Sequence, residues 1–479
     1  MARPRVTSQF IQTPIASPLA IGSRVLAIIA TGSTKFYITE KLTRGSASYD
    51  TLIHKPTGAT DPDRTTGIVR IGSYISTNSD TSGVPFVAST DYNIDTATPG
   101  TYKLTWSTHK PALNETYYVT YYYDKAPAVG SAWNDYTPRL YSNFNDVLNN
   151  YGPINYTTSL DVASYATLGA QIAFDIGVKN IIIAQADSSD ATGFGTAITR
   201  LEQSIGGINP FYVVALTGGI VTGDADTVRG KLIAHCKKMA SVEFGKERYP
   251  YVGLKDYAGT GLTASTFTAM ASAYSDSRVI LIGDYTPIRS IKDTDGNTQS
   301  VTLDGTFDAL AKAAFRCTQA PVSEPMMNKA INGAFTGYSR KWNDTDIDIL
   351  VDGCVCVSED IAGIIKVVDD ITTNGADEVE IDISTVETRD ILIKQIRTSL
   401  SDRFKGIRSK TSTTADIVAL VDTELDKAIK NDLALAKGKI SANRASGSLR
   451  RWEVGFTYYP VTKVRDIDVS FSIDLGLIA

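Results

Sequence analysis

NIIIAQ, at Asn180–Gln185, is the first of four short apolar segments that decide the fold. The other three are FYVVAL at Phe211–Leu216, YPYVGL at Tyr249–Leu254 and RVILIG at Arg278–Gly283. Each has the length of a strand, and helical patterns separate them. Strands that alternate with helices form a sheet that carries helices on its faces. Residues 125–465 are therefore predicted to form an α/β core domain with a mixed sheet.

Apolar spacing of three to four residues predicts the helices of this core. The clearest cases are Asp224–Ala240 and Thr414–Leu435, and Asp390–Phe404 shows the same spacing. A short strand is expected at Glu378–Ile383. A flexible stretch is expected at Ser441–Ser448, before a final core strand at Arg451–Tyr459 and a proline that ends it. The segments Thr263–Ser275 and Pro287–Leu303 read as a further helix and a hairpin.

Residues 25–124 have a different character. They are rich in Thr, Tyr, Val and Ser, and Gly, Pro, Asn and Asp interrupt them often. Thr101–Trp106 and Tyr117–Tyr123 are strong strand candidates. This region is predicted to be an added, outer all-β domain, either a small barrel or a sandwich.

Both ends of the chain resemble extended arms. Residues 1–24 contain three prolines, which exclude a helix, among scattered apolar residues. Residues 466–479 contain a strictly alternating strand pattern close to the chain end. Such strands either add to the sheets of neighbouring subunits or form edge strands of the chain's own sheet. The apolar arm residues are Val6, Phe10, Ile11, Ile467, Val469, Phe471, Ile473 and Leu475.

Composition narrows the function classes. The chain has 479 residues, 43% of them apolar, and a net charge of −5. That charge does not favour bulk nucleic-acid binding, and no apolar run is long enough to predict a membrane span. Four cysteines in so long a chain predict no disulfide framework and fit a reducing cytoplasm. Whether Cys236, Cys317, Cys354 or Cys356 cross-links subunits is left open.

The sequence contains only weak matches to motifs for catalysis, cofactor binding or metal binding. Gly193-Phe194-Gly195 follows a predicted strand, but Ile198 stands where a dinucleotide fingerprint needs its third glycine. His235 lies beside Cys236 within a predicted helix, where neighbouring side chains do not face each other. Cys354 and Cys356 are expected on one side of a buried strand, and Asp344, Asp346 and Asp348 on a solvated strand face. No catalytic, cofactor or metal site is predicted, and the chain is expected not to be an enzyme.

A run of basic residues precedes the end of the core. It contains Lys427, Lys430, Lys437, Lys439 and Arg444, against a single acid, Asp432. One interpretation is a solvated helix end, which the helix dipole favours. The other is a docking surface for an acidic partner.

Five further segments are informative through their order and spacing, namely Leu140–Leu148, Ile205–Pro210, Asp369–Thr373, Asp390–Gly406 and Trp452–Leu475. Together they resemble contractile phage-tail sheath proteins. The similarity covers about residues 125–479 and the N-terminal arm, whereas residues 25–124 match only as an added outer domain. Asp370 departs from the family pattern, which has glycine there, and this puts the local turn in doubt.

The resemblance implies a structural subunit that polymerises as stacked six-membered rings around a tail tube, with its arms adding strands to neighbours. Contraction would drive the tube through the host envelope. The implied partners are further copies of the chain, the tube protein, and baseplate and tail terminator proteins, without nucleic acid or direct membrane insertion. The implied location is the virion tail, after assembly in the host cytoplasm. The basic run would face the tube. The alternatives are another virion or baseplate component, or an α/β enzyme with a β accessory domain.

Overall fold

The computed structural model describes most of the core and parts of the β domain. The described residues are 24–32, 35–47, 49–52, 68–72, 92–95, 102–107, 113–114, 116–124, 136–152, 154, 164–203, 205, 207–218, 220–241, 244–255, 262–284, 286–292, 298–319, 322–361, 363–375, 380–404, 413–446 and 452–463.

A six-stranded mixed sheet organises the core, in the order β12-β11-β10-β1-β9-β8. Its strands pair in parallel except β8, which runs antiparallel to β9 at one edge. The four apolar segments predicted as strands are β9 to β12, so the predicted α/β core with a mixed sheet is confirmed. The strands are β1 (Leu26–Ala30), β8 (Arg139–Tyr141), β9 (Ile181–Gln185), β10 (Tyr212–Ala215), β11 (Tyr249–Val252) and β12 (Ile280–Leu281).

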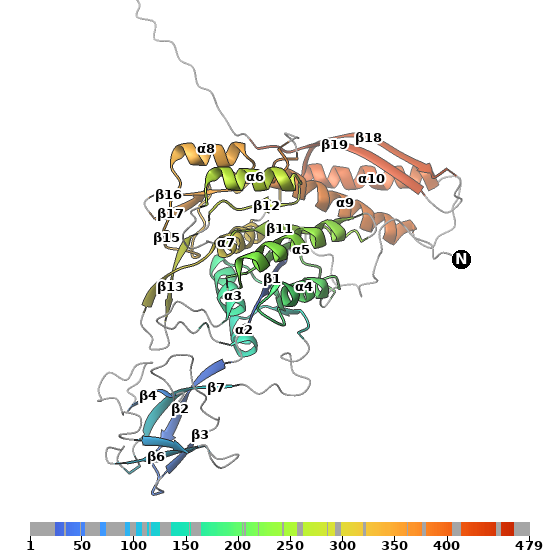
Figure 1. Ribbon diagram of the computed structural model, residues 1–479. Helices are drawn as coiled ribbons and strands as arrows, with labels where there is room; N and C mark the ends of the chain where they lie inside the picture. Colours follow the sequence, from blue (N-terminus) through green and yellow to red (C-terminus); the bar gives the residue numbers. More distant parts are fainter. Residues whose placement is uncertain are drawn as a thin grey trace, which may run out of the picture.

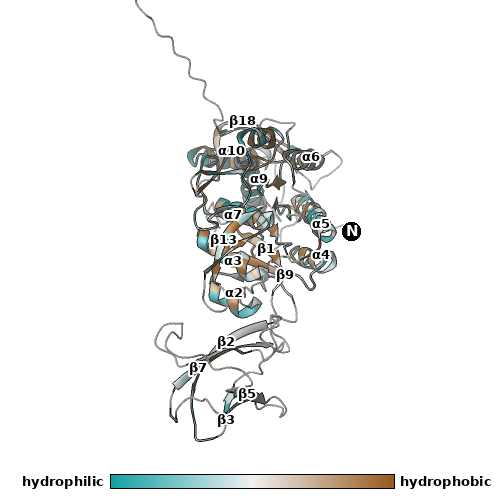
Figure 2. Ribbon diagram, turned by 60° about the vertical axis from the view of Figure 1, so that its left-hand side comes forward, coloured by the Kyte–Doolittle hydropathy of each residue, from teal (hydrophilic) through white to brown (hydrophobic). Residues whose placement is uncertain are grey.

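Helices cover both faces of this sheet (Figure 2). On one face α3 (Tyr165–Ile176) and α7 (Gly305–Thr318) pack on the strands, together with the short α2 (Phe144–Tyr151). On the other face lie α4 (Ala191–Arg200) and α5 (Thr222–Ala240). Alternate residues of β1 enter the two resulting cores, which is the geometry of a strand buried on both sides.

The position of β1 corrects the predicted domain boundary. Leu26–Ala30 was assigned to the outer β domain, but it lies in the middle of the core sheet, between β9 and β10. All five of its residues are buried, as expected of a strand covered by helices on both faces. The β domain is therefore inserted into the core, between β1 and β8.

The inserted β domain is a sandwich in its described part. One sheet has the order β2-β7-β4 and the other β3-β6-β5. The two sheets share an apolar core that includes Leu104, Trp106, Tyr117 and Val119. In Figure 1 the sandwich lies beyond α2, apart from the core helices. Its strands are β2 (Lys35–Thr43), β3 (Tyr49–Leu52), β4 (Ile68–Gly72), β5 (Tyr92–Asp95), β6 (Tyr102–Trp106) and β7 (Thr116–Asp124).

Smaller elements extend the core beyond β12. The predicted helix and hairpin appear as α6 (Ala264–Tyr274) and as β13 (Pro287–Lys292) with β14 (Thr298–Thr302). Short strands follow, namely β15 (Gly337–Tyr338), β16 (Ser358–Ile361) and β17 (Ile364–Val367).

Two local predictions in this part are wrong. Asp344, Asp346 and Asp348 lie on a helix, α8 (Asp344–Asp352), because the Asn343 side chain caps its first turn, where acids are favoured. Cys354 has a left-handed φ of 63°, so the chain turns there. Cys354 and Cys356 consequently enter different apolar clusters rather than one side of a strand.

The C-terminal part differs from its prediction at three places. The helix α9 (Ile383–Phe404) begins where the strand Glu378–Ile383 was expected to end, and Asp382 contributes only a single bridge to Ile371. The helix α10 (Thr413–Lys430) is shorter than Thr414–Leu435. The strand β18 (Ala434–Arg444) follows it and includes the start of the stretch expected to be flexible. It pairs with β19 (Trp452–Pro460).

The end of α10 has a clear physical cause. Asp432 adopts a left-handed φ of 55°, and the Leu433 N–H bonds back to the Ala428 carbonyl at 2.9 Å. This closes the helix before Leu433, although Leu433 continues the apolar spacing. No helix in the described part of the chain combines the length and the apolarity needed to cross a bilayer.

Candidate functional site

The arm residues predicted from the sequence lie outside the described residues. This applies to Val6, Phe10 and Ile11 at one end and to Ile467, Val469, Phe471, Ile473 and Leu475 at the other. The described chain begins at Arg24 and ends at Lys463. The candidate assembly surface is therefore built from the C-terminal elements near Lys463, from Arg24, and from the basic run.

The β18–β19 hairpin lies over α10, which packs in turn on α9 (Figure 1). Alternation in β19 produces this placement, because every second residue is half-buried and those between are exposed. Val454, Phe456 and Tyr458 face an apolar cluster that includes Val421 and Leu425 of α10. Among the described residues, the hairpin is thus attached to the core through this inner face.

Both outer edges of the hairpin are open within the described part of the chain. β18 and β19 form a two-stranded sheet there, so each strand presents one edge of backbone N–H and C=O groups without a ladder partner. Near the base of the hairpin, Leu435 and Tyr459 are 65% and 61% exposed. Open strand edges beside exposed apolar side chains are suited to accept further strands.

The predicted basic run is divided between α10 and β18, and acids neutralise part of it. Lys437 on β18 forms ion pairs with Asp422 at 2.6 Å and Asp426 at 2.8 Å, both on α10. Hydrogen bonds to these two carboxylates raise the pKa of Lys437. Lys427 pairs with Glu424 at 2.8 Å. These acids precede the basic run in sequence, so counting charges within the run missed them.

The rest of the basic run is exposed. The side chains of Lys430 and Lys439 reach the surface, and Arg444 lies over the Trp452 ring at 5.5 Å from its centroid. The interpretation as a solvated helix end holds only for Lys427 and Lys430, because Lys437, Lys439 and Arg444 belong to a strand.

Lys463, the last described residue, is held in a buried acidic cluster. Its ammonium group contacts Asp369, Asp370 at 3.2 Å and Asp382 at 2.8 Å, and all four side chains are at most 7% exposed. Burial opposes the charge on Lys463, but the carboxylates, Asp370 first, outweigh it and raise the Lys463 pKa. Asp370 has no left-handed φ, so the turn that its departure from the family pattern put in doubt requires no glycine.

Arg24, the first described residue, lies in a second buried cluster. Its guanidinium group donates to the Gln319 carbonyl and lies 3.7 Å from Glu387. Glu387 also accepts from Arg316 at 2.8 Å. Burial raises the pKa of Glu387, while the two arginines, Arg316 first, oppose that rise. The segment that precedes β1 is therefore fastened to α7 and α9.

The crevice where doubly wound sheets bind ligands is filled by the chain itself. It lies at the carboxyl ends of β1 and β10, because the chain passes from β9, on one side of β1, to β10, on its other side. The Thr31 carbonyl accepts from the Ala166 N–H at 3.0 Å. A Cβ at Gly218 would lie 2.5 Å from Asp304 and 2.7 Å from the Tyr165 ring.

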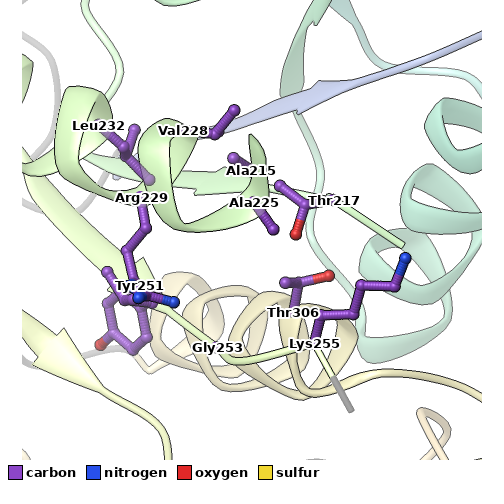
Figure 3. Close-up of a pocket in the computed structure, with 11 residues that line it drawn as sticks. Ala215, Thr217, Ala225, Val228, Arg229, Leu232, Tyr251, Gly253, Lys255 and Thr306 are labelled. Atoms are coloured by element: carbon purple, nitrogen blue, oxygen red, sulfur yellow. The ribbon is translucent and has the colours of Figure 1, made fainter. Parts of the chain in front are cut away.

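A small cavity lies beside this crevice, at the ends of β10 and β11 (Figure 3). Its volume of about 10 Å³ is near the minimum for one water molecule. Lys255, one of its lining residues, donates to the Ile220 carbonyl. The described residues contain no group of acids, histidines or cysteines arranged to hold a metal ion.

Burial keeps two of the cysteines and His235 in their uncharged forms. No disulfide joins the four cysteines among the described residues, and Cys317 is half-buried whereas the other three are buried. Burial raises the pKa of Cys236 and of Cys356 to about 12, which keeps both as thiols. His235 is buried and contacts the Arg248 guanidinium at 2.6 Å. Burial, with Arg248, lowers its pKa to about 4, so it is neutral near pH 7.

Sequence reasoning missed both buried clusters. Lys463 lies 94 and 93 residues from Asp369 and Asp370 in the chain. No periodicity links residues that far apart. The one local signal was the adjacent acid pair Asp369–Asp370 in an otherwise apolar context, which was noted only for the family resemblance.

Comparisons with known proteins concern the fold. No family model matches the sequence, and no curated protein sequence matches it. A chain of the anti-feeding prophage baseplate, solved with six-fold symmetry, superposes with a TM-score of 0.53 at 12% identity, covering 72% of this chain and 90% of that one. The helical sheath of the same prophage in its contracted state gives a TM-score of 0.52 at 12% identity, with coverage of 71% and 88%.

A contracted sheath of an extracellular contractile injection system, PVC, is also similar. It gives a TM-score of 0.52 at 12% identity, with coverage of 71% of this chain and 89% of that chain. Two of these neighbours are thus sheath chains in a contracted state and one is a baseplate chain, and this chain shares their fold, as the sequence resemblance indicated.

Proposed function

We propose that this chain is the structural subunit of a contractile tail sheath. The observation that carries the proposal is the shared fold with sheath chains whose lengths are covered almost completely. The filled crevice at the end of β1 and β10 supports a structural rather than a catalytic role. The polymer would be built from stacked six-membered rings around a tail tube, and its contraction would drive the tube through the host envelope.

Strand addition would link the subunits, with the β18–β19 hairpin as the acceptor. Its two outer edges are open among the described residues, and it is fixed to the core through α10. Arms from neighbours, carrying Val6, Phe10 and Ile11 or Ile467–Leu475, have the alternating or extended apolar character that such edges accept. Main-chain hydrogen bonds would give affinity, and exposed Leu435 and Tyr459 would add apolar contact.

The basic run would face the tube, although fewer of its residues are available than the sequence suggested. Lys430, Lys439 and Arg444 are exposed, whereas Lys427 and Lys437 are paired with acids of the same chain. Exposed cations favour an acidic partner surface and speed its encounter. Further partners would be the baseplate and tail terminator proteins, in a virion tail assembled in the host cytoplasm.

Electron microscopy of the negatively stained chain, alone and with its tube protein, tests this proposal. Hollow helical cylinders with six-fold end views are expected. Dispersed monomers or small closed oligomers, with and without the tube, would contradict it. Deleting residues 468–479 should leave soluble subunits that do not polymerise, while a deletion of only residues 477–479, which spares the alternating strand, serves as the control.

The inserted sandwich would lie outermost and be dispensable for polymerisation. Because β1 belongs to the core sheet, the deletion that tests this must keep Leu26–Ala30 and remove only residues 35–124. Polymers are expected from that variant. A folded variant unable to polymerise would refute the outer position.

A further inference from the structure

Each terminal segment joins the described core at a buried cation. Lys463 has an exposed side-chain fraction of 2%, and Arg24 of 3%. Lysine and arginine are rarely buried to that extent unless they are paired, because their charges lose hydration. Burial at these two positions fixes the place from which each segment continues.

Among the described residues, the Lys463 cluster has more acids than cations. Three carboxylates, from Asp369, Asp370 and Asp382, surround one ammonium group. The Met326 N–H also donates to Asp370 at 3.0 Å. If Lys463 moved away, the carboxylates would remain buried and would repel one another. The electrostatic cost of that state holds the end of the described chain in place.

The Arg24 cluster has the opposite imbalance. Two guanidinium groups, from Arg24 and Arg316, share the carboxylate of Glu387. Arg316 is further satisfied by the Val322 carbonyl at 2.5 Å. Removal of Arg24 would therefore leave a balanced Arg316–Glu387 pair, whereas removal of Glu387 would leave two buried cations.

The two clusters meet at the start of one helix. Asp382 immediately precedes α9, and its carbonyl accepts from the Val386 N–H at 3.1 Å. Glu387 follows Asp382 by five residues, which is about 7.5 Å along a helix axis. The same helix carries Leu392 and Ile396, which lie in the apolar cluster beneath α10 and the hairpin.

We propose that the start of α9, with Asp382 and Glu387, is a common anchor for both arms, and that its ion pairs with Lys463 and Arg24 set the direction in which each arm leaves the core. This inference rests on the proposed function, because it assumes that the arms bind neighbouring subunits. A displacement imposed on either arm is passed to α9, and from α9 to the hairpin that receives the arms of other subunits. Lys463 and Arg24 are in this sense positioning residues for strand exchange.

Three variants test the anchor. Lys463→Met removes the charge but keeps a long side chain, Lys463→Arg restores a cation, and Arg24→Met leaves the Arg316–Glu387 pair balanced. Lys179→Met, at an exposed lysine in the turn before β9, is the matched control. Amide hydrogen exchange of residues 452–463 is measured on the subunit, and the critical concentration for polymerisation by sedimentation.

We expect Lys463→Met to speed exchange in β19 and to raise the critical concentration, each on the order of tenfold, with both effects largely reversed in Lys463→Arg. Arg24→Met should raise the critical concentration while the core keeps its thermal midpoint. Lys179→Met should change neither exchange nor critical concentration.

Unchanged exchange in Lys463→Met would overturn the anchor, and so would faster exchange with a wild-type critical concentration. If Lys463→Met fails to fold, the critical concentration of Arg24→Met tests the anchor instead. If the wild-type chain forms no polymer, the proposed function fails, and hydrogen exchange on the subunits still decides whether the clusters fix the ends of the described chain.

Discussion

The six-stranded core sheet and the C-terminal hairpin are both built from regular strands, but they are enclosed to very different extents. Helices cover the core sheet on both faces, and its strands β1, β9 and β10 are completely buried or nearly so. The hairpin has one face on α10 and one in solvent, and its outer edges are open among the described residues. The hairpin also carries the exposed Leu435 and Tyr459.

This difference separates the core sheet from the proposed strand acceptor. A sheet that helices cover on both faces is packed on both sides of its inner strands and tolerates little change in shape. A hairpin attached through one face can receive strands without unfolding anything else. The contrast predicts that changes in the core alter subunit stability, whereas changes on the hairpin alter assembly.

The largest effect is expected from Gly253→Ala in the core. A Cβ there would lie 1.9 Å from the Gly305 carbonyl oxygen and 2.6 Å from the Thr306 nitrogen, so the loop after β11 or the start of α7 must move. We expect a loss of about 3 kcal/mol or more in the free energy of unfolding, measured with urea.

Gly230→Ala is the matched control, because Gly230 lies exposed within α5 and a Cβ there has no heavy atom within 4 Å. It should stabilise the chain by about 0.5–1 kcal/mol. Equal effects of the two alanines would show that the close approach of β11 and α7 does not constrain the core.

The next largest effect is a dependence of the free energy of unfolding on pH, which is caused by His235. Its folded pKa of about 4 lies below the ordinary value of 6.5, because of burial and of Arg248 beside it. Between these two values the unfolded state binds more protons. The contribution of His235 to the free energy of unfolding is therefore complete above about pH 6.5. It falls by up to about 3 kcal/mol as the pH is lowered to 4.

His235→Gln removes this titration and keeps an acceptor for Arg248. The difference in unfolding free energy between wild type and variant should shrink as pH falls from 6.5 to 4. Taking the difference cancels other groups, such as Asp284, whose pKa burial raises to about 7. A difference that does not change with pH would contradict the buried neutral histidine.

The same contrast explains which parts of the structure the sequence predicts. The strands β9 to β12 were found because each is an apolar run between helical patterns. The strand β1 was misassigned because the inserted sandwich follows it, and local patterns do not reveal that a chain returns to the same sheet. The strand β18 was missed because Leu433 continues the spacing of α10, while a left-handed Asp432 ends the helix.

The candidate site was predictable only in part. The exposed basic residues Lys430, Lys439 and Arg444 were named from sequence, but the ion pairs of Lys437 depend on how β18 folds over α10. The clusters around Lys463 and Arg24 join segments distant in sequence. Charge pairing over such distances leaves no periodic trace.

A smaller effect should follow from opening the hairpin. Phe456 and Tyr459 are aromatic residues of β19, but Phe456 faces the cluster on α10 and Tyr459 faces solvent. Phe456→Ala should weaken the hairpin by about 1–2 kcal/mol, less than for a fully buried phenylalanine. Hydrogen exchange should then quicken in β18 and β19 but not in β1 or β10.

Tyr459→Ala, the control, should leave exchange unchanged in the subunit and reduce polymerisation. If Phe456→Ala accelerated exchange equally in the core sheet, hairpin and core would unfold as one unit. The distinction between scaffold and acceptor would then be wrong.

The smallest effect on the subunit is expected from charge reversal in the basic run, which contains two kinds of lysine. Lys437→Glu would place a third acid beside Asp422 and Asp426, so weaker tube binding in that variant could arise from a disturbed hairpin. Lys430→Glu with Lys439→Glu changes exposed residues that form no ion pair among the described residues, so hydrogen exchange of the subunit should stay as in wild type.

Affinity of this double variant for the tube should fall roughly three- to tenfold at low salt and approach the wild-type value at high salt, because surface charge pairs are weak and screened. Cosedimentation with the tube at two salt concentrations measures this. Wild-type affinity of the double variant at low salt would move the tube-facing surface away from the basic run.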